Sequence, residues 1–220
     1  MYAARRDGVA IPRGKPYIWA TWLSRVMTGH VSCQWQYWFL AWHKLVQEQA
    51  ATFDSVGWQI RHTRLLTEVR QELTAAGVGA NTELAFQCRV PGCDVLINGK
   101  IDCLAVDGRI VTVYDCKTGK PRSSDRAQVM IYMYALSTYP RFAGSLIRGM
   151  VVYQDRRDEI PSLPEDFADQ LAYFTGLLVA DGPPAREPGR DCRFCKITSD
   201  DCPDRWDGED ALWGLDGPEE

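Results

Sequence analysis

The 220-residue sequence has no run of about 18 apolar residues, and we therefore expect no membrane-spanning helix. The first eight residues are basic but no apolar stretch follows them, which argues against a secretory signal and favours a cytoplasmic protein. Without export, the eight cysteines are better interpreted as thiols or metal ligands than as a disulfide framework. A phosphate-binding loop is also missing, because Lys117–Lys120 lacks the glycine spacing and Pro121 stands where Ser or Thr is needed.

The sequence also lacks an excess of positive charge, since its formal net charge is −4. The distribution is uneven: residues 1–70 carry nine Lys and Arg against four Asp and Glu, residues 71–180 eleven against thirteen, and residues 181–220 five against twelve. This pattern predicts modest, salt-sensitive affinity for nucleic acid rather than tight non-specific binding. The apolar content of 45% and the eight tryptophans are typical of a folded globular protein.

Hydrophobic periodicity predicts a single α/β domain. Expected helices are one that carries Trp35, Trp38, Phe39 and Trp42, followed by residues 55–76, 126–138 and 162–180. Expected strands are residues 83–90, 95–106, 109–117 and 147–153. Ser123–Asp125 is interpreted as the N-cap of one helix and Ser162–Glu165 as the capping box of another. Residues 1–16 are expected to be irregular, and residues 206–220 to form a flexible acidic tail.

The polar residues at the end of one apolar strand carry the strongest chemical signal. Asp115 and Lys117 follow the apolar run 110–114 and, two residues apart on a strand, point to the same face, while Cys116 points away. Asp102 lies on the preceding strand, across a hairpin turned at Asp107-Gly108. Two carboxylates beside one lysine form a site for a hard cation such as Mg²⁺ or Mn²⁺.

Two neighbouring segments add candidate residues in a fixed order. Gln128 and Tyr132, four residues apart, share one face of the helix that follows the strand. His62 lies on the apolar stripe of the expected helix 55–76, where a histidine without this context is usually a packed core residue. Glu83, at the start of the first expected strand, is a further acidic candidate, although a solvated strand end is its ordinary interpretation.

These motifs together resemble the PD-(D/E)XK nucleases, in particular their RecB-like branch. The matching segments, in chain order, are Gly57 to His62, Gly99-Lys100-Ile101-Asp102, Asp115-Cys116-Lys117, and Gln128 with Tyr132. The cysteines resemble the iron–sulfur subgroup of that branch, which includes CRISPR-associated RecB-like exonucleases and phage-borne relatives. The resemblance extends over about residues 20 to 205. Each motif is weak by itself, and their ordered occurrence carries the resemblance.

The resemblance implies a restriction-endonuclease-like core, a mixed central β-sheet flanked by helices, over about residues 50–160. Asp102 and Asp115 are expected to hold Mg²⁺ or Mn²⁺, with the backbone carbonyl of Cys116 and the ring of His62 as further ligands. Lys117 is expected to orient the attacking water or to stabilise the phosphate in the transition state. The resemblance also implies that Gln128 and Tyr132 hold the lysine or the substrate backbone.

Cys192, Cys195 and Cys202 form a C-x2-C-x6-C triple in a short segment, a spacing typical of a metal site. Chemistry alone leaves Cys88, Cys93 and Cys103 open as the fourth ligand, whereas the resemblance implies Cys33. Four thiolates suit a 4Fe–4S cluster or zinc, and the resemblance favours the cluster. This iron–sulfur subregion would join segments 18–49 and 181–205. Cys103 and Cys116 are otherwise expected to be core thiols.

The sequence thus predicts a metal-dependent DNA exonuclease acting on single-stranded ends. The alternatives are a sequence- or structure-specific endonuclease of the same fold, and a non-catalytic nucleic-acid-binding module with a zinc site. DNA is the expected partner, with protein partners in CRISPR adaptation or recombination implied by the resemblance. The polarity of cleavage, the strand preference, the pathway and the oligomeric state do not follow from the sequence.

Overall fold

The computed structural model describes residues 10–46, 55–206 and 208. The predictions for residues 1–9 and for most of the acidic tail therefore lie outside the described residues. Within the described ranges, no helix is both long enough and apolar enough to span a membrane.

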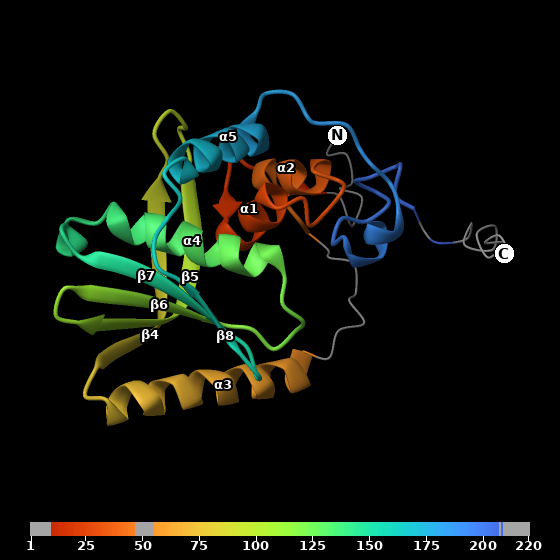
Figure 1. Ribbon diagram of the computed structural model, residues 1–220. Coiled ribbons are helices and arrows are strands. Elements are labelled where there is room, and N and C mark those ends of the chain that lie inside the picture. Colours follow the sequence, from red (N-terminus) through yellow and green to blue (C-terminus); the bar gives the residue numbers. More distant parts are fainter. Residues whose placement is uncertain (1–9, 47–54, 207, 209–220) are drawn as a thin grey trace, which may run out of the picture.

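A six-stranded mixed sheet forms the centre of the molecule (Figure 1). Its strands run in the order β2-β5-β6-β7-β8, and β4 pairs with β5 outside this path. The β2–β5 and β6–β7 pairs are parallel, and the other pairs are antiparallel. The strands are β2 (Ile18–Trp19), β4 (Gly79–Arg89), β5 (Leu96–Asp107), β6 (Ile110–Cys116), β7 (Leu146–Val152) and β8 (Arg157–Ile160). A separate two-stranded sheet pairs β1 (Ile11–Pro12) with β3 (His43–Lys44).

Helices cover both faces of the central sheet (Figure 1). The α-helices are α1 (Ala20–Met27), α2 (Trp35–Trp42), α3 (Ser55–Ala75), α4 (Ser123–Ser137) and α5 (Phe167–Val179), and the short 3-10 helices are η1 (Pro140–Phe142) and η2 (Arg190–Phe194). On one face α4 packs on β6 and β7, with α1, α2 and α5 beyond it. On the other face α3 lies alone beneath the sheet (Figure 1).

The two faces bury cores of different size. The larger core lies between the sheet and the helices α1, α2, α4 and α5. Gly149 of β7 lets α4 approach closely, because a Cβ there would stand 2.3 Å from Val129 Cγ1. The smaller core, on the α3 side, is formed by Leu65, Val69, Cys103, Cys116 and Val152. Cys103 and Cys116 are therefore core thiols, as the sequence predicts.

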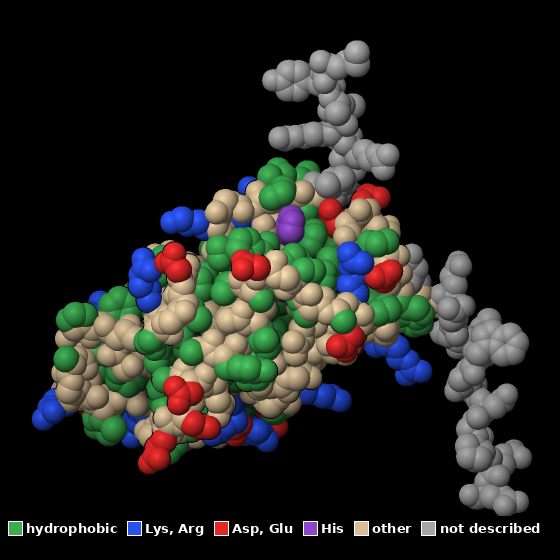
Figure 2. Space-filling view, turned by 90° about the horizontal axis from the view of Figure 1, so that it is seen from above, with side chains coloured by type: hydrophobic (Ala, Val, Ile, Leu, Met, Phe, Trp, Pro, Cys, Tyr) green, Lys and Arg blue, Asp and Glu red, His purple; other side chains and the backbone are tan. Residues whose placement is uncertain are grey.

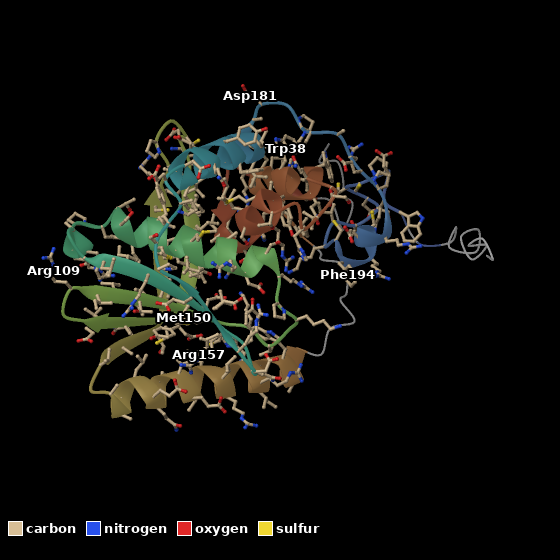
Figure 3. All side chains as sticks on the ribbon, in the orientation of Figure 1. Trp38, Arg109, Met150, Arg157, Asp181 and Phe194 are labelled. Atoms are coloured by element: carbon tan, nitrogen blue, oxygen red, sulfur yellow. The ribbon has the colours of Figure 1, made fainter. Side chains whose placement is uncertain are left out.

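Two side-chain contacts fasten the outer elements to this frame (Figure 3). Trp38 of α2 donates its indole N–H to the carbonyl of Ala180, 2.9 Å away, just after α5. Arg157 of β8 pairs with Glu72 of α3, which ties the edge of the sheet to the helix beneath it. The register of β8 is set by its antiparallel pairing with β7, and the Arg157–Glu72 pair adds a surface contact to α3.

Most expected elements are present within a few residues of their predicted bounds, but two helix starts were wrong. Helix α4 already begins at Ser123, so Ser123–Asp125 is its first turn, and Asp125 Oδ2 accepts from the backbone N–H of Arg122 at 3.0 Å. Helix α5 begins at Phe167, after a turn at Glu165–Asp166, so the expected capping box Ser162–Glu165 precedes the helix and does not open it. Helix α1 and the short strands β1, β2, β3 and β8 were not predicted, and β1 lies within residues 1–16, which were expected to be irregular.

Candidate active site

A cleft of ≈ 730 Å³ opens at one end of the central sheet, between α3, α4 and the start of α1. It is lined by side chains of the six residues that the sequence analysis singled out, namely His62, Asp102, Asp115, Lys117, Gln128 and Tyr132. The fold brings these residues together from α3, β5, β6, the loop after β6, and α4. The carboxyl end of β6 and the N-terminal end of α4 meet here because one short loop connects them (Figure 1).

Asp102 lies between a histidine and a backbone amide. Its Oδ2 accepts a hydrogen bond from the N–H of Cys116 at 2.7 Å, and His62 Nε2 lies 3.1 Å from the same oxygen. This hydrogen bond raises the pKa of His62, although partial burial of the ring opposes the change. Trp58, one helical turn before His62, stacks on the imidazole with ring centroids 5.1 Å apart. The imidazole of His62 is therefore held at its edge by Asp102 and on one face by Trp58.

Asp115 is the most deeply buried polar group of the cleft, with a side chain only 2% exposed. Its Oδ1 accepts from Gln128 Nε2 at 3.2 Å, and Lys117 Nζ lies 2.8 Å from its Oδ2. The latter contact is an ion pair without the alignment of a hydrogen bond, and among the described residues no hydrogen bond reaches Oδ2. Burial, together with the charge of Asp102, raises the pKa of Asp115 to about 6 against the attraction of Lys117.

Lys117 follows the last residue of β6 and is anchored by its own backbone. Its N–H donates to the carbonyl of Val152 at 2.8 Å, which continues the β6–β7 ladder by one residue. Its Nζ donates to Gln128 Oε1 at 3.0 Å and pairs with Asp115. Burial works to lower the pKa of Lys117, but the adjacent Asp115 carboxylate outweighs it and the pKa is raised. The side chain is therefore a fixed cation, as the strand geometry predicts.

Gln128 and Tyr132 of α4 complete the hydrogen-bond network one helical turn apart. Gln128 donates through Nε2 to both Asp115 and the hydroxyl of Tyr132, and accepts from Lys117 through Oε1. The Tyr132 ring packs edge-on against Phe86 of β4, with centroids 5.3 Å apart. Gly99 makes room for this pair, because a Cβ there would stand 2.3 Å from Phe86 Cε1 and 3.2 Å from Tyr132 Cε1. Phe86 therefore fixes the Tyr132 ring, and the Tyr132 hydroxyl in turn helps to fix the orientation of the Gln128 amide.

The walls of the cleft contain residues that the sequence analysis missed or left weak. Basic and aromatic side chains line it, namely Trp19, Arg25, Trp58, Arg61, Lys120 and Arg122. Trp58 could have been found, since it precedes His62 by four residues on a helix and so shares its face. Glu83 also lines the cleft, where its carboxylate pairs with Lys100 at 2.8 Å. Its backbone φ of 54° is unusual for a residue with a side chain.

A second, smaller cavity is lined by the four cysteines of the predicted metal site, Cys33, Cys192, Cys195 and Cys202. Cys33 reaches it from just before α2, and the other three come from η2 and the segment after it. Burial raises the pKa of Cys195 and of Cys202. Gly189 N donates to Cys192 Sγ at 3.4 Å.

The remaining cysteines lie outside this cavity. Cys88 and Cys103 are buried, and burial raises the pKa of Cys88 to about 12 and that of Cys103 to about 11. Cys93 is half-buried, with its thiol directed at the carbonyl of Ala172. Over the described part of the chain, no three His, Cys, Asp or Glu side chains are arranged closely enough to hold a metal ion as they stand.

Comparison with known proteins identifies the family. The sequence profile of the PD-(D/E)XK nuclease superfamily matches residues 21–199, and the chain belongs to this superfamily of nucleases. The mixed sheet flanked by helices fits the restriction-endonuclease-like fold predicted from the sequence. The chain is also similar to the solved structure of SSO0001, with 19% identity and a TM-score of 0.47 over 88% of this chain and 89% of that one. No curated protein matches the chain.

Proposed function

We propose that this nuclease is a metal-dependent DNA exonuclease that hydrolyses phosphodiester bonds at single-stranded ends. The observation that carries the proposal is the placement of Asp115. It is a buried carboxylate at the end of a strand, paired with a lysine, beside a second carboxylate and open to a cleft. Burying such a charge is costly, and a site that maintains it in a cleft is a candidate for chemistry.

The carboxylates of the cleft have the chemistry that a divalent cation with oxygen ligands requires, and they would have to move closer together to hold one. Asp115 Oδ2 is a buried carboxylate oxygen that lies 2.8 Å from Lys117 Nζ, and a carboxylate oxygen has a second lone pair for an ion. Asp102, 15% exposed, is close enough for its charge to raise the pKa of Asp115. Asp102, Asp115 and His62 would hold Mg²⁺ or Mn²⁺, which when bound lowers the pKa of coordinated water and neutralises charge on the phosphate. The carbonyl of Cys116 is the proposed fourth ligand.

The other polar residues would serve the reaction by position and charge. Lys117 presents a permanent positive charge next to the carboxylates, where it can orient water or stabilise the phosphate as negative charge develops. Gln128 and Tyr132 would hold the lysine amine in place through the hydrogen bonds described above. His62, hydrogen-bonded to Asp102, would add a nitrogen ligand and favour Mn²⁺.

The charge distribution supports DNA as the substrate. Arg25, Lys120 and Arg122 line the cleft and supply the positive charge that a polyanion requires. On the face seen in Figure 2, Lys and Arg side chains lie mainly around the edges and form no continuous patch. This contrast favours the cleft over that face as the place where DNA binds.

The four-cysteine cavity supports a structural 4Fe–4S cluster, with zinc as the less favoured occupant. The backbone N–H of Gly189 donates to Cys192 Sγ, a kind of contact that stabilises a thiolate and recurs at thiolate-bound metals. Cys33 would join the segment before α2 to the C-terminal segment and so make residues 1–220 one unit. The metal would close a long loop, where a crosslink most strongly constrains the unfolded chain.

The decisive experiment measures cleavage of end-labelled single- and double-stranded DNA, linear and circular, with Mg²⁺ or Mn²⁺. Asp115→Asn and Lys117→Ala should each lower the rate by at least about a hundred-fold, more than the loss of a supporting residue. Asp94→Asn is the matched control, since this carboxylate is 94% exposed and does not line the cleft. Unchanged cleavage by the folded Asp115→Asn protein would refute the proposal, and cleavage of circular DNA would replace the exonuclease with an endonuclease.

A further inference from the structure

The first turn of α4 presents hydrogen-bond donors to the cleft. Ser124, the second residue of this 15-residue helix, is only 5% exposed and lines the cleft, yet its hydroxyl has no hydrogen-bond partner among the described residues. Leaving a buried hydroxyl unpaired is costly, which points to a partner that binds from the cleft. The N–H groups and the dipole of a helix N-terminus favour an anion as that partner.

Two arginines stand beside this helix end, and neutral groups orient both of them. Arg122, the N-cap residue of α4, directs Nη1 at His30 Nε2, 3.3 Å away, and Arg25 of α1 donates through Nη1 to the Tyr37 hydroxyl at 3.2 Å. Burial, together with the charges of Arg122 and Arg25, lowers the pKa of His30, so this imidazole is a neutral acceptor. Among the described residues neither guanidinium has a carboxylate partner.

The two guanidinium charges lie close enough together for both to act on one imidazole. Helix α1 packs against α4, so Arg25 and Arg122 face the cleft from adjoining elements (Figure 1). Like charges gathered in this way repel one another, and an anion between them removes the repulsion. The arginines and the buried hydroxyl are thus two separate indications of an anion at the same helix end.

The carboxylate in this turn of α4 is already engaged within the protein. Asp125 Oδ2 accepts from the backbone N–H of Arg122 and from the hydroxyl of Tyr153, each at 3.0 Å. These bonds hold the start of α4 against the end of β7. Asp125 therefore fixes the helix end and leaves the arginine side chains to another anion.

The position of this helix end relative to the proposed catalytic residues limits what the anion can be. Ser124 precedes Gln128 by one helical turn, about 6 Å along the axis. Gln128 in turn contacts Asp115 at 3.2 Å and Lys117 at 3.0 Å. One nucleotide step of an extended strand can span this separation, so the anion would be a phosphate next to the reacting one.

We propose that the N-terminus of α4, with Ser124, Arg122 and Arg25, is a subsite for the terminal phosphate group of a DNA strand. The proposal rests on the proposed nuclease function and deepens it by naming the feature of the substrate that is recognised. A phosphate monoester carries about two negative charges and three acceptor oxygens, whereas an internal diester carries a single charge. Two guanidiniums without carboxylate partners, a hydroxyl and a helix N-terminus suit the monoester. Holding the strand end here would place the adjoining phosphodiester at the proposed metal site.

The test compares single-stranded oligonucleotides that carry a phosphate or a hydroxyl at the 5′ or the 3′ end. Each has a fluorophore on an internal base, and affinity is measured by anisotropy in the presence of a chelator. In the unaltered protein, a phosphate at one of the two ends should strengthen binding by at least about ten-fold, as expected for charge-assisted hydrogen bonds. Arg122→Gln and Ser124→Ala should each reduce this preference several-fold, and the double variant should abolish it.

Two control variants make the same chemical changes on the same helix but outside the cleft. Ser123→Ala removes the neighbouring exposed hydroxyl, and Arg126→Gln removes a guanidinium that donates to the carbonyl of Glu159 at 3.4 Å. Both controls should keep the full preference for the phosphorylated end. If they lose it as Ser124→Ala and Arg122→Gln do, the effect belongs to the charge or stability of α4 as a whole, and the subsite is refuted.

The outcomes also separate this proposal from the proposed function. If the protein cleaves DNA but binds phosphate and hydroxyl ends equally, the subsite is refuted and the nuclease function stands. If the preference depends on Arg122 and Ser124 but no metal supports cleavage, the subsite stands and the proposed function fails. Equal losses of affinity for phosphate-ended and hydroxyl-ended DNA in Arg122→Gln and Ser124→Ala would assign these residues to an internal phosphodiester and overturn the proposal.

Discussion

The candidate active-site cleft and the cysteine cavity lie in one chain but are held together by different kinds of contact. In the cleft the charged groups satisfy one another: His62 contacts Asp102, Lys117 pairs with Asp115, and Gln128 bridges lysine and carboxylate. In the cysteine cavity the groups of interest are thiols, and burial raises the pKa of two of them, Cys195 and Cys202. The cleft is thus polarised before any metal binds, whereas the thiols must lose protons to bind one.

The two sites are also built from different parts of the fold. The cleft is built on the central sheet and on α4, and both contribute buried side chains to the larger core. The cysteine cavity is made by irregular segments that are distant in sequence, with Cys33 on one side and η2 on the other. We therefore expect metal to be needed for structure in the cavity and for chemistry in the cleft.

The largest effect should follow from removing one cysteine of the cavity. Cys195→Ser should abolish bound iron or zinc and lower the free energy of unfolding by several kcal/mol, on the order of 3 or more, because the metal joins distant segments. Metal analysis and thermal melting measure both effects. Cys93→Ser is the control, since Cys93 lies outside the cavity. This variant should keep the metal. Full metal content in Cys195→Ser would contradict the proposed site.

The next effect concerns the pH dependence of stability without metal. Because the folded-state pKa of Asp115, about 6, exceeds its ordinary value of 3.8, this group stabilises the fold most below pH 3.8, and that contribution is lost as pH rises through about 6. The loss should be on the order of a few kcal/mol for so buried a group. Melting curves in chelator from pH 4 to 7 should show this slope in the unaltered protein and not in Asp115→Asn. Equal slopes would show that Asp115 is not perturbed.

The residues of the cleft were easier to predict from the sequence than the assembly of the cysteine cavity. Asp102, Asp115 and Lys117 could be placed together because strands alternate with a fixed period and the Asp107-Gly108 turn sets the register; Gly108 does adopt a φ of 58°. The spacing of Gln128 and Tyr132 likewise follows from one helix. Local periodicity was sufficient for these residues, since each lies on a regular element that enters the cleft or, for Lys117, directly follows one.

The parts that could not be predicted depend on contacts between distant segments. The approach of Cys33 to Cys192 has no local signal and was implied only by the resemblance. Trp19 and Arg25 reach the wall of the cleft because β2 pairs in parallel with β5. Strand β2 has only two residues, too few for a sequence pattern to predict this pairing. The start of α5 at Phe167 was missed because Ser162–Glu165 reads as a capping box although the chain there forms a turn.

A smaller effect should come from the core support of the cleft. Gly99→Ala would bring a Cβ to 2.3 Å from Phe86 Cε1, so Phe86 and the adjoining Tyr132 must shift. Overpacking of this kind typically costs about 1–3 kcal/mol, and we expect cleavage to fall as Gln128 loses its orientation. Gly176→Ala is the control, because a Cβ there meets nothing within 4 Å and the helix α5 should be slightly stabilised. Equal stability and activity in the two variants would show that the Gly99 contact does not position the site.

The smallest effect should isolate one hydrogen bond of the cleft. Tyr132→Phe keeps the ring on Phe86 but removes the hydroxyl that accepts from Gln128 Nε2. Gln128 would still bridge Asp115 and Lys117, so we expect cleavage to fall only about ten-fold, the equivalent of about 1.4 kcal/mol, with folding intact. Tyr134→Phe, on the same helix but packed toward Phe167, should have no effect on cleavage. The measurement is the single-turnover cleavage rate at saturating Mn²⁺. A decrease in this rate as large as that of Lys117→Ala would mean that the hydroxyl acts directly in the reaction. An unchanged rate would mean that Gln128 is held by Asp115 and Lys117 alone.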